Sequence, residues 1–338
     1  MWQTVGHDHA IRLLRNSIET GRVSHAYLFS GPRQIGKATL ARDFARALNC
    51  LEPDHPCGHC RSCKKIEASI HPDVQIIELE EGSKNISIDA VRKMREGVAL
   101  RPFEGRTKVY IIEEVERLSE PAANSLLKTL EEPPPSVVMV LTTLDAASLL
   151  PTVVSRCQQV ELRPVPPAAV EAALQERHGV DPERARLLAT LAKGRMGWAL
   201  QTASSRNALE KRSELLERLL ALAGTGRVGR FAYAAELATL HGRDPEAAKN
   251  ALEMWQSWWR DLLLSRLGLT ELVVNTDLRG RMKMEAASYS VEALGRMVRS
   301  IQQTMALLGQ NVNARLALEA LMLSVPKGAI SEQRLVSS

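Results

Sequence analysis

The chain has 338 residues, a formal net charge of +5 and 25% charged residues, the composition of a soluble globular protein. This length exceeds one ordinary core, so we expect two or three domains. No apolar run approaches membrane-spanning length, which excludes a membrane protein. The N-terminus lacks the basic-then-apolar pattern of a signal peptide, so we expect a cytoplasmic location.

An amphipathic helix over residues 8–20 precedes the first predicted strand, Ala26–Ser30. The sequence GPRQIGKAT follows and predicts a phosphate-binding P-loop that opens a helix over residues 38–49. In such a loop, backbone N–H groups and the helix N-terminus hold phosphates, and a lysine reaches the outer ones. Ala38 stands where Ser or Thr normally binds magnesium, so the site is either a working ATPase or a vestigial one. The predicted phosphate-binding residues are Gly31, Pro32, Gly36, Lys37, Ala38 and Thr39.

Four of the five cysteines lie within residues 50–63. In a chain without an export signal, this crowding favours metal binding over disulfides. Two overlapping C-x-x-C steps, with a further cysteine at a helix end, predict a closed, structural zinc site. The predicted ligands are Cys50, Cys57, Cys60 and Cys63. His55 and His59 are alternative ligands, and unrelated free thiols are the alternative interpretation.

A strand over residues 108–112 ends in two carboxylates, Glu113 and Glu114. In P-loop ATPases the strand beside the P-loop strand ends this way: the first acid, normally Asp, holds magnesium, and the second activates water. Glu113 is one methylene longer than Asp, and two solvated acids are the alternative. A further strand over residues 137–143 ends in Thr143, which either senses a γ-phosphate or caps the loop.

Strands alternate with helices up to a proline-rich linker at residues 163–167, which predicts an α/β domain on a mostly parallel sheet. Three short helices are expected over residues 168–205, and long amphipathic helices follow from residue 207. Tryptophans on adjoining faces of the helix over residues 245–266 favour a helix-packing seam over a base-stacking platform. These are Trp255, Trp258 and Trp259.

Several stretches together carry a family resemblance. They are SHAYLFSGP at 24–32, the cysteine module at 50–63, His71-Pro72-Asp73, VYIIEEVERLS at 109–119, NSLLKTLEEPP at 124–134, Ser155-Arg156-Cys157 and NVNARLALEALML at 311–323. With them the chain resembles the clamp-loader group of AAA+ ATPases, and within it the delta-prime subunit family of bacterial DNA polymerase III. The resemblance implies an AAA+ RecA-like domain with a zinc module over residues 1–165, a helical lid over 166–206, and a helical collar over 207–338.

The implied function is that of a stator subunit in a hetero-pentamer with delta and tau/gamma motor subunits. This complex loads the sliding clamp onto primed DNA during replication. The chain would belong to a DNA polymerase holoenzyme, a nucleotidyltransferase, without being a polymerase, and would have weak or no ATPase. Arg156 of the Ser-Arg-Cys triplet is implied as an arginine finger that acts in trans on a neighbour's nucleotide. The alternative is that Arg156 caps a helix or binds a surface acid.

The family's motor subunits carry Thr where Ala38 stands, Asp where Glu113 stands, and a sensor arginine at the position of Gly197. These departures favour the stator over an ATP-hydrolysing tau/gamma-type subunit. Arg195, two residues from Gly197, is the candidate substitute for the sensor. Because Lys37 is retained, binding of Mg-ATP in the chain's own site is left open. A stand-alone zinc and DNA-binding protein is a third alternative.

Overall fold

The structure is a computed structural model that describes residues 1–80, 82–83, 85–310 and 312–326. It divides into two compact units, Met1–Gln201 and Thr202–Ser338. Residues 166–201 of the expected lid, 166–206, belong to the first of these units. Within the described ranges, every helix is too short or too polar to cross a membrane. Asn311, which begins the NVNARLALEALML stretch, and the end of the expected collar after residue 326 lie outside the described residues.

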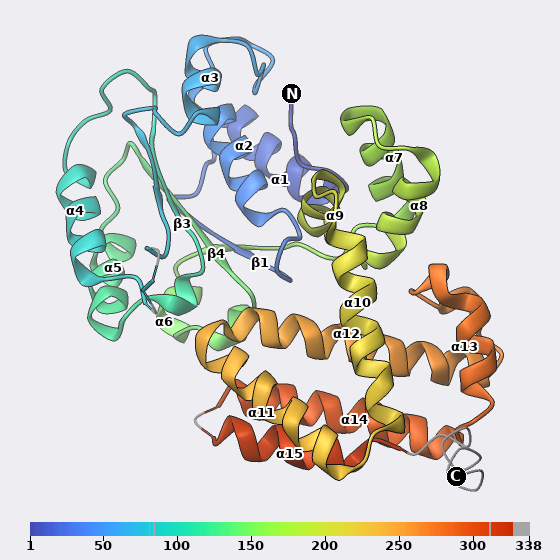
Figure 1. Cartoon of the computed structure of the whole chain (residues 1–338). Helices are drawn as coiled ribbons and strands as arrows, with labels where there is room; N and C mark the ends of the chain where they lie inside the picture. Colours follow the sequence, from blue (N-terminus) through green and yellow to red (C-terminus); the bar gives the residue numbers. More distant parts are fainter. Residues whose placement is uncertain (81, 84, 311, 327–338) are drawn as a thin grey trace, which may run out of the picture. The chain divides into compact units, whose positions relative to one another are not determined.

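A parallel sheet in the order β2-β3-β4-β1-β5 forms the centre of the first unit (Figure 1). Register pairs Ser30 with Thr143 and Ile112 with Leu141, so the carboxyl ends of β1, β3 and β4 meet at one edge. The strands are β1 (Ala26–Ser30), β2 (Val74–Ile77), β3 (Lys108–Ile112), β4 (Val137–Thr143) and β5 (Gln158–Glu161).

One expectation about this sheet is wrong. The strand that ends before Glu113 and Glu114 does not lie beside the P-loop strand, because β4 is inserted between β1 and β3. Sequence order could not reveal this, since β4 comes later in the chain and joins the sheet by a crossover. The two acids still reach the same edge as the P-loop, because all the strands are parallel.

Alternate strand residues contact different helices. Tyr27 and Phe29 pack with α1 and α2, whereas Leu28 packs with α4 and α5. This alternation is typical of a strand that is buried on both faces, and Figure 1 shows the sheet between these helix layers. The helices are α1 (Asp8–Glu19), α2 (Lys37–Asn49), α3 (Arg61–Glu67), α4 (Ile88–Val98), α5 (Glu120–Glu131), α6 (Pro151–Val154), α7 (Pro167–His178), α8 (Pro182–Leu191) and α9 (Met196–Ser204).

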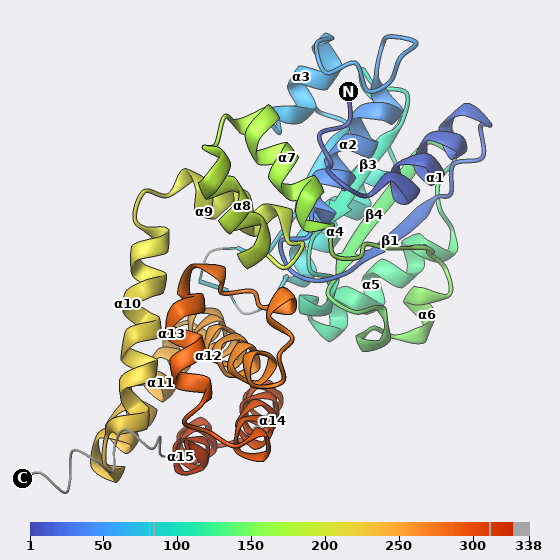
Figure 2. The same cartoon turned by 90° about the vertical axis from the view of Figure 1, so that its right-hand side faces the viewer.

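The second unit is built around α12, whose tryptophans are at most 2% exposed. Trp259 packs edge-to-face on Tyr289 with ring centroids 5.3 Å apart. This confirms the packing seam and rules out a base-stacking platform. Figures 1 and 2 show α12, α14 and α15 lying alongside one another. The helices are α10 (Ala208–Ala221), α11 (Arg227–Arg243), α12 (Pro245–Arg266), α13 (Arg279–Ala286), α14 (Val291–Leu308) and α15 (Ala314–Ser324).

Candidate functional site: a P-loop edge, a cysteine cluster and an exposed arginine

The four predicted cysteine ligands converge, with their sulfur atoms all within 4.8 Å of one another. Cys57 Sγ and Cys63 Sγ are 3.9 Å apart, close to the separation of about 3.8 Å expected for two thiolates about 2.3 Å from a tetrahedral zinc. Cys50 follows α2, and Cys60 caps α3, whose first turn carries Cys63. This cluster could hold a metal ion. Among the described residues it does not include the two histidines considered as alternative ligands, His55 and His59.

Backbone N–H groups point at the cysteine sulfurs. The Cys57 N–H donates to Cys50 Sγ at 3.4 Å, and the Cys60 N–H donates to Cys57 Sγ at 3.3 Å. Burial raises the pKa of Cys50 and Cys63. Desolvation also acts to raise the pKa of Cys60, but hydrogen bonds from the backbone of Leu51 and Cys63 and from neighbouring thiols lower it to about 6. Such bonds favour the thiolate, which is the form that binds metal.

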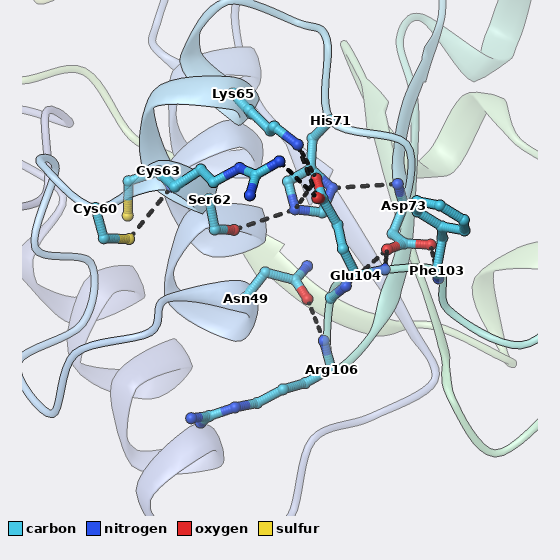
Figure 3. A network of polar contacts seen from close by, with 12 residues as sticks. Asn49, Cys60, Ser62, Cys63, Lys65, His71, Asp73, Phe103, Glu104 and Arg106 are labelled. Carbon is cyan, nitrogen blue, oxygen red and sulfur yellow. Dashed lines mark hydrogen bonds and ion pairs between the residues drawn. The ribbon is translucent and has the colours of Figure 1, made fainter.

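A polar network joins the cysteine module to the sheet (Figure 3). His71 Nδ1 accepts the Asp73 N–H at 3.1 Å, so Nε2 carries the proton and donates to Ser62 Oγ on α3, also at 3.1 Å. Lys65 of α3 donates to Glu104 at 2.6 Å. Burial lowers the pKa of His71, which keeps the ring neutral in this arrangement.

Asp73 organises the loop before β3. Its carboxylate accepts the backbone N–H groups of residues 103–105 at 2.7, 2.9 and 2.7 Å. Burial acts to raise the pKa of Asp73, but these three bonds hold it below its ordinary value. Asn49, next to the first cysteine ligand, accepts the N–H groups of Arg106 and Thr107 at 2.9 and 3.0 Å. The His-Pro-Asp stretch therefore supports the cysteine module and the loop before β3.

The P-loop has the backbone its glycines predict. Gly31 has φ +149° and Gly36 φ +120°, in the region that favours glycine. A Cβ atom on Gly31 would lie 2.4 Å from the carbonyl oxygen of Leu162, so no side chain fits there. The Gly31 N–H donates to the Thr143 carbonyl at 3.2 Å, which ties the loop to β4.

The P-loop lysine is held by its own loop. Lys37 Nζ donates to the carbonyl oxygens of Gly31 at 2.6 Å and Pro32 at 2.9 Å. Burial lowers the pKa of Lys37 to about 8, against the opposing pull of nearby glutamates. Ala38 and Thr39 are half-buried in the first turn of α2. Ala38 offers no hydroxyl for a metal ion.

Both acids after β3 are paired with arginines. Glu113 lies 3.5 Å from Arg42, and burial raises its pKa. Glu114 lies 3.5 Å from Arg33 and 2.7 Å from Arg117. The carboxylates that would bind magnesium and activate water in a motor are thus engaged within the chain.

Thr143 and α9, the third helix after the linker, complete this edge. Thr143 is fully buried, and its Oγ1 donates to the Asp145 carbonyl at 3.2 Å, so the hydroxyl caps the loop after β4. The Gly197 N–H donates to the Gln34 carbonyl of the P-loop at 2.8 Å. A Cβ atom on Gly197 would lie 2.9 Å from that oxygen, so glycine permits the close approach of α9.

Arg195, the candidate substitute for a sensor arginine, has two contacts close to it in the chain. Its Nε donates to the Ala192 carbonyl at 3.2 Å, and its guanidinium lies 5.9 Å from the centre of the Trp198 ring.

Arg156 follows α6 and is 35% exposed. Its Nη2 lies 2.9 Å from Glu131 Oε1, and its Nη1 donates to the Thr152 carbonyl at 3.1 Å. The next residue, Cys157, packs against the core beneath α5, and burial raises the pKa of this thiol to about 12. The triplet is therefore anchored by Cys157 and presents the guanidinium at the surface. The sequence did not single out Glu131, although it lies within the NSLLKTLEEPP stretch.

A P-loop at the carboxyl edge of this parallel sheet, followed by helices, defines an α/β protein of the P-loop class. The family described as "DNA polymerase III, delta subunit" matches residues 6–166, and "DNA polymerase III, delta subunit, C terminal" matches residues 206–326. The chain is 30% identical over 319 residues to DNA polymerase III subunit delta' of Bacillus subtilis, covering 94% of this chain and 95% of that protein. The chain belongs to the delta' family of DNA polymerase III subunits.

Other DNA polymerase III subunits match the chain over a smaller share of their own length. DNA polymerase III subunit tau of Escherichia coli is 38% identical over 243 residues, which cover 70% of this chain but 35% of tau. The chain thus spans about a third of that relative. A solved DNA polymerase III gamma subunit-related protein from Thermotoga maritima is 19% identical with a TM-score of 0.48, covering 96% of this chain and 99% of that one. The Bacillus subtilis relative confirms the resemblance to the delta-prime family. The structure confirms the predicted α/β domain followed by helices.

Proposed function

We propose that this chain is a non-hydrolysing clamp-loader subunit that assists ATP-driven loading of a sliding clamp onto primed DNA. The observation that supports this proposal most directly is that the polar groups at the chain's own P-loop edge bind one another. Lys37 is bonded to loop carbonyls, while Glu113 and Glu114 are paired with arginines. A magnesium-dependent hydrolase needs these three groups directed at nucleotide, metal and water.

The proposed working group is Arg156, acting as a finger on a neighbouring motor subunit. An arginine supplied in trans stabilises the charge that develops on the transferred phosphoryl group. To reach a neighbour's phosphate, Arg156 would exchange the Glu131 carboxylate for a phosphate oxygen. An exposed ion pair of this kind contributes about 1 kcal/mol or less, so the exchange loses little free energy.

The chain's own nucleotide site is proposed to be vestigial. Phosphate binding would require Lys37 to leave two carbonyl oxygens, and the amide cradle of the loop would remain available. Hydrolysis would additionally need a metal-binding hydroxyl that Ala38 lacks. At Gly197, the direct contact of α9 with the P-loop leaves no room for a sensor side chain.

We assign zinc to the cysteine cluster. Four sulfur ligands with no open position are typical of a structural zinc site, and the observed sulfur spacing fits that geometry. Bound zinc would close a loop that has no core of its own. Reduced thiols of this kind suit the cytoplasm, where we place the protein.

The proposed partners are delta and tau/gamma-type motor subunits in a hetero-pentamer, the sliding clamp, and primed DNA bound through the assembled complex. The second candidate, a tau/gamma-type motor, is favoured only by the retained P-loop glycines and lysine. Two measurements separate them: turnover of Mg-ATP by the purified chain, and turnover by the other loader subunits with and without it. We expect no turnover alone, co-purification with the other subunits, and stimulation of the complex. Robust turnover by the isolated chain that Lys37→Ala abolishes would establish the motor instead.

A further inference from the structure

The second unit carries a cavity of about 400 Å³ that the proposed clamp-loading role does not use. It lies where the end of α12 and the segment after it meet α13, two helices that pack together (Figure 1). Its lining includes three basic residues, two hydroxyl groups and small apolar residues. Those used below are Arg266, Val273, Arg279, Lys283, Ala286 and Ala287.

The basic residues at this cavity are not neutralised. Arg266, Arg279 and Lys283 are all exposed, and in the described part of the chain none of them has an ion pair. Their side chains come from both sides of the cavity, since Arg266 ends α12 while the other two lie on α13. Three convergent cations without carboxylate partners favour an anionic ligand.

The acids nearby are used elsewhere. Asp277 pairs with Arg212 at 2.8 Å, and Glu285 pairs with Arg281 at 2.6 Å. Glu271 is the remaining acid between residues 265 and 287, and it does not line the cavity. The positive rim is therefore a local property of this cavity rather than of the whole helix pair.

The floor of the cavity is apolar. Val273 and Ala286 are buried there, and the exposed side chains of Leu272 (52%) and Met284 (69%) lie next to lining residues in the chain. Aromatic side chains, on which nucleic-acid bases stack, do not occur among the described lining residues. A ligand that satisfies both rim and floor needs carboxylates together with an apolar side chain.

We propose that this cavity binds an acidic peptide segment of a partner protein. An apolar side chain of the peptide covers Val273 and Ala286, and its carboxylates pair with Arg279, Lys283 and Arg266. Guanidinium groups bind carboxylates through paired hydrogen bonds, so the site would select the orientation of the bound carboxylate as well as its charge. The cavity volume of about 400 Å³ lies in the range of about 300–1,000 Å³ that is typical of ligand-binding pockets.

The test titrates the full-length chain into a fluorescent peptide, Asp-Glu-Leu-Asp-Leu, and follows anisotropy at 150 mM salt, about physiological ionic strength. We expect saturable binding that falls about tenfold or more in Arg279→Glu/Lys283→Glu, since two charge-assisted contacts are lost. Ala287→Trp, which fills the cavity mouth without changing charge, should weaken binding as well. The matched control, Lys211→Glu/Arg243→Glu, changes net charge equally at exposed residues that do not line the cavity, and its binding should stay within about twofold of the parent's.

Two further ligands decide what kind of site this is. A peptide with serine in place of both leucines should lose binding, because the apolar floor is then left uncovered. Equal binding by that peptide, equal loss in the control variant, or no binding at about 1 mM peptide would overturn the proposal. Tighter binding of a single-stranded oligothymidine, lost in the same cavity variant, would replace the peptide with a nucleic acid.

Discussion

The buried side chain of Arg230 connects helix ends inside the helical unit. It lies in α11, is 7% exposed, and donates to four backbone carbonyls at helix ends. The acceptors are Leu222 at 3.0 Å, Ala223 at 3.1 Å, Met322 at 3.4 Å and Val325 at 2.7 Å. Carbonyls at helix C-termini lack intrahelical partners and carry partial negative charge. One guanidinium therefore joins the end of α10 to the end of α15.

Arg230→Ala removes all four bonds and leaves buried carbonyls without donors. A buried group left unsatisfied costs about 1–3 kcal/mol, and water will reach some of these four, so we expect a loss of about 3 kcal/mol in the free energy of unfolding. With a urea dependence of about 1.5 kcal/mol per M, the unfolding midpoint should fall by about 2 M. Arg230→Lys keeps the charge but not the planar set of N–H donors, so its unfolding midpoint should lie between those of the parent and Arg230→Ala.

The assay is urea unfolding followed by tryptophan fluorescence, since the three buried tryptophans of α12 report on this unit. Each unit's transition is fitted separately, because a two-unit chain need not unfold in one step. Arg230→Met is the control for lost volume. A midpoint for both the Ala and Met variants within about 0.3 M of the parent would refute the role of these bonds. Parent-like stability of the Met variant alone would show that packing, not hydrogen bonding, is what matters.

Three other predictions concern the first unit. Cys63→Ser should abolish the zinc found by native mass spectrometry and expose the module to protease, whereas Cys157→Ser should keep the metal; zinc-free parent protein that was never chelated would count against the site. Because the pKa of Asp73 is held below its ordinary value of 3.8, its stabilisation is complete above about pH 4 and fades as the pH falls further. The protection of the amides at 103–105 against hydrogen exchange, measured relative to their intrinsic rates at each pH, should follow that course. In Asp73→Asn this protection should no longer change with pH over that range; unchanged protection of the parent at pH 2.5 would contradict the bonding. Lys37→Ala should leave assembly and the complex's ATPase within about twofold of the parent, and a large drop would mean that this P-loop works.

Much of the fold followed from periodicity. The strand Ala26–Ser30 and the helix Pro245–Arg266 were predicted at their observed bounds, because each has a strong pattern and clear stop signals. The helices α3 and α13 were not predicted. The first is only Arg61–Glu67 and carries two of the cysteines, and the second, Arg279–Ala286, is too short and polar for a periodic pattern.

The site was predictable where chemistry depends on spacing within the sequence. The four cysteines were found this way, since a metal ligand set has a local signature. Arg230 and the pairing of Glu114 with Arg33 were not predicted, because they depend on residues that only the fold brings together. The position of β4 between β1 and β3 was not predicted for the same reason, because it too depends on the fold.

The role proposed for Arg156 is that of a finger on a neighbour's nucleotide. The direct measurement is single-turnover ATP hydrolysis and clamp loading by the reconstituted complex with Arg156→Ala, against Arg163→Ala, an exposed arginine paired with Glu161 at 3.1 Å. We predict intact assembly for both, and for Arg156→Ala a loss of about 10³-fold at the motor site next to this chain, with loading impaired. Normal hydrolysis and loading by an intact Arg156→Ala complex would contradict the account.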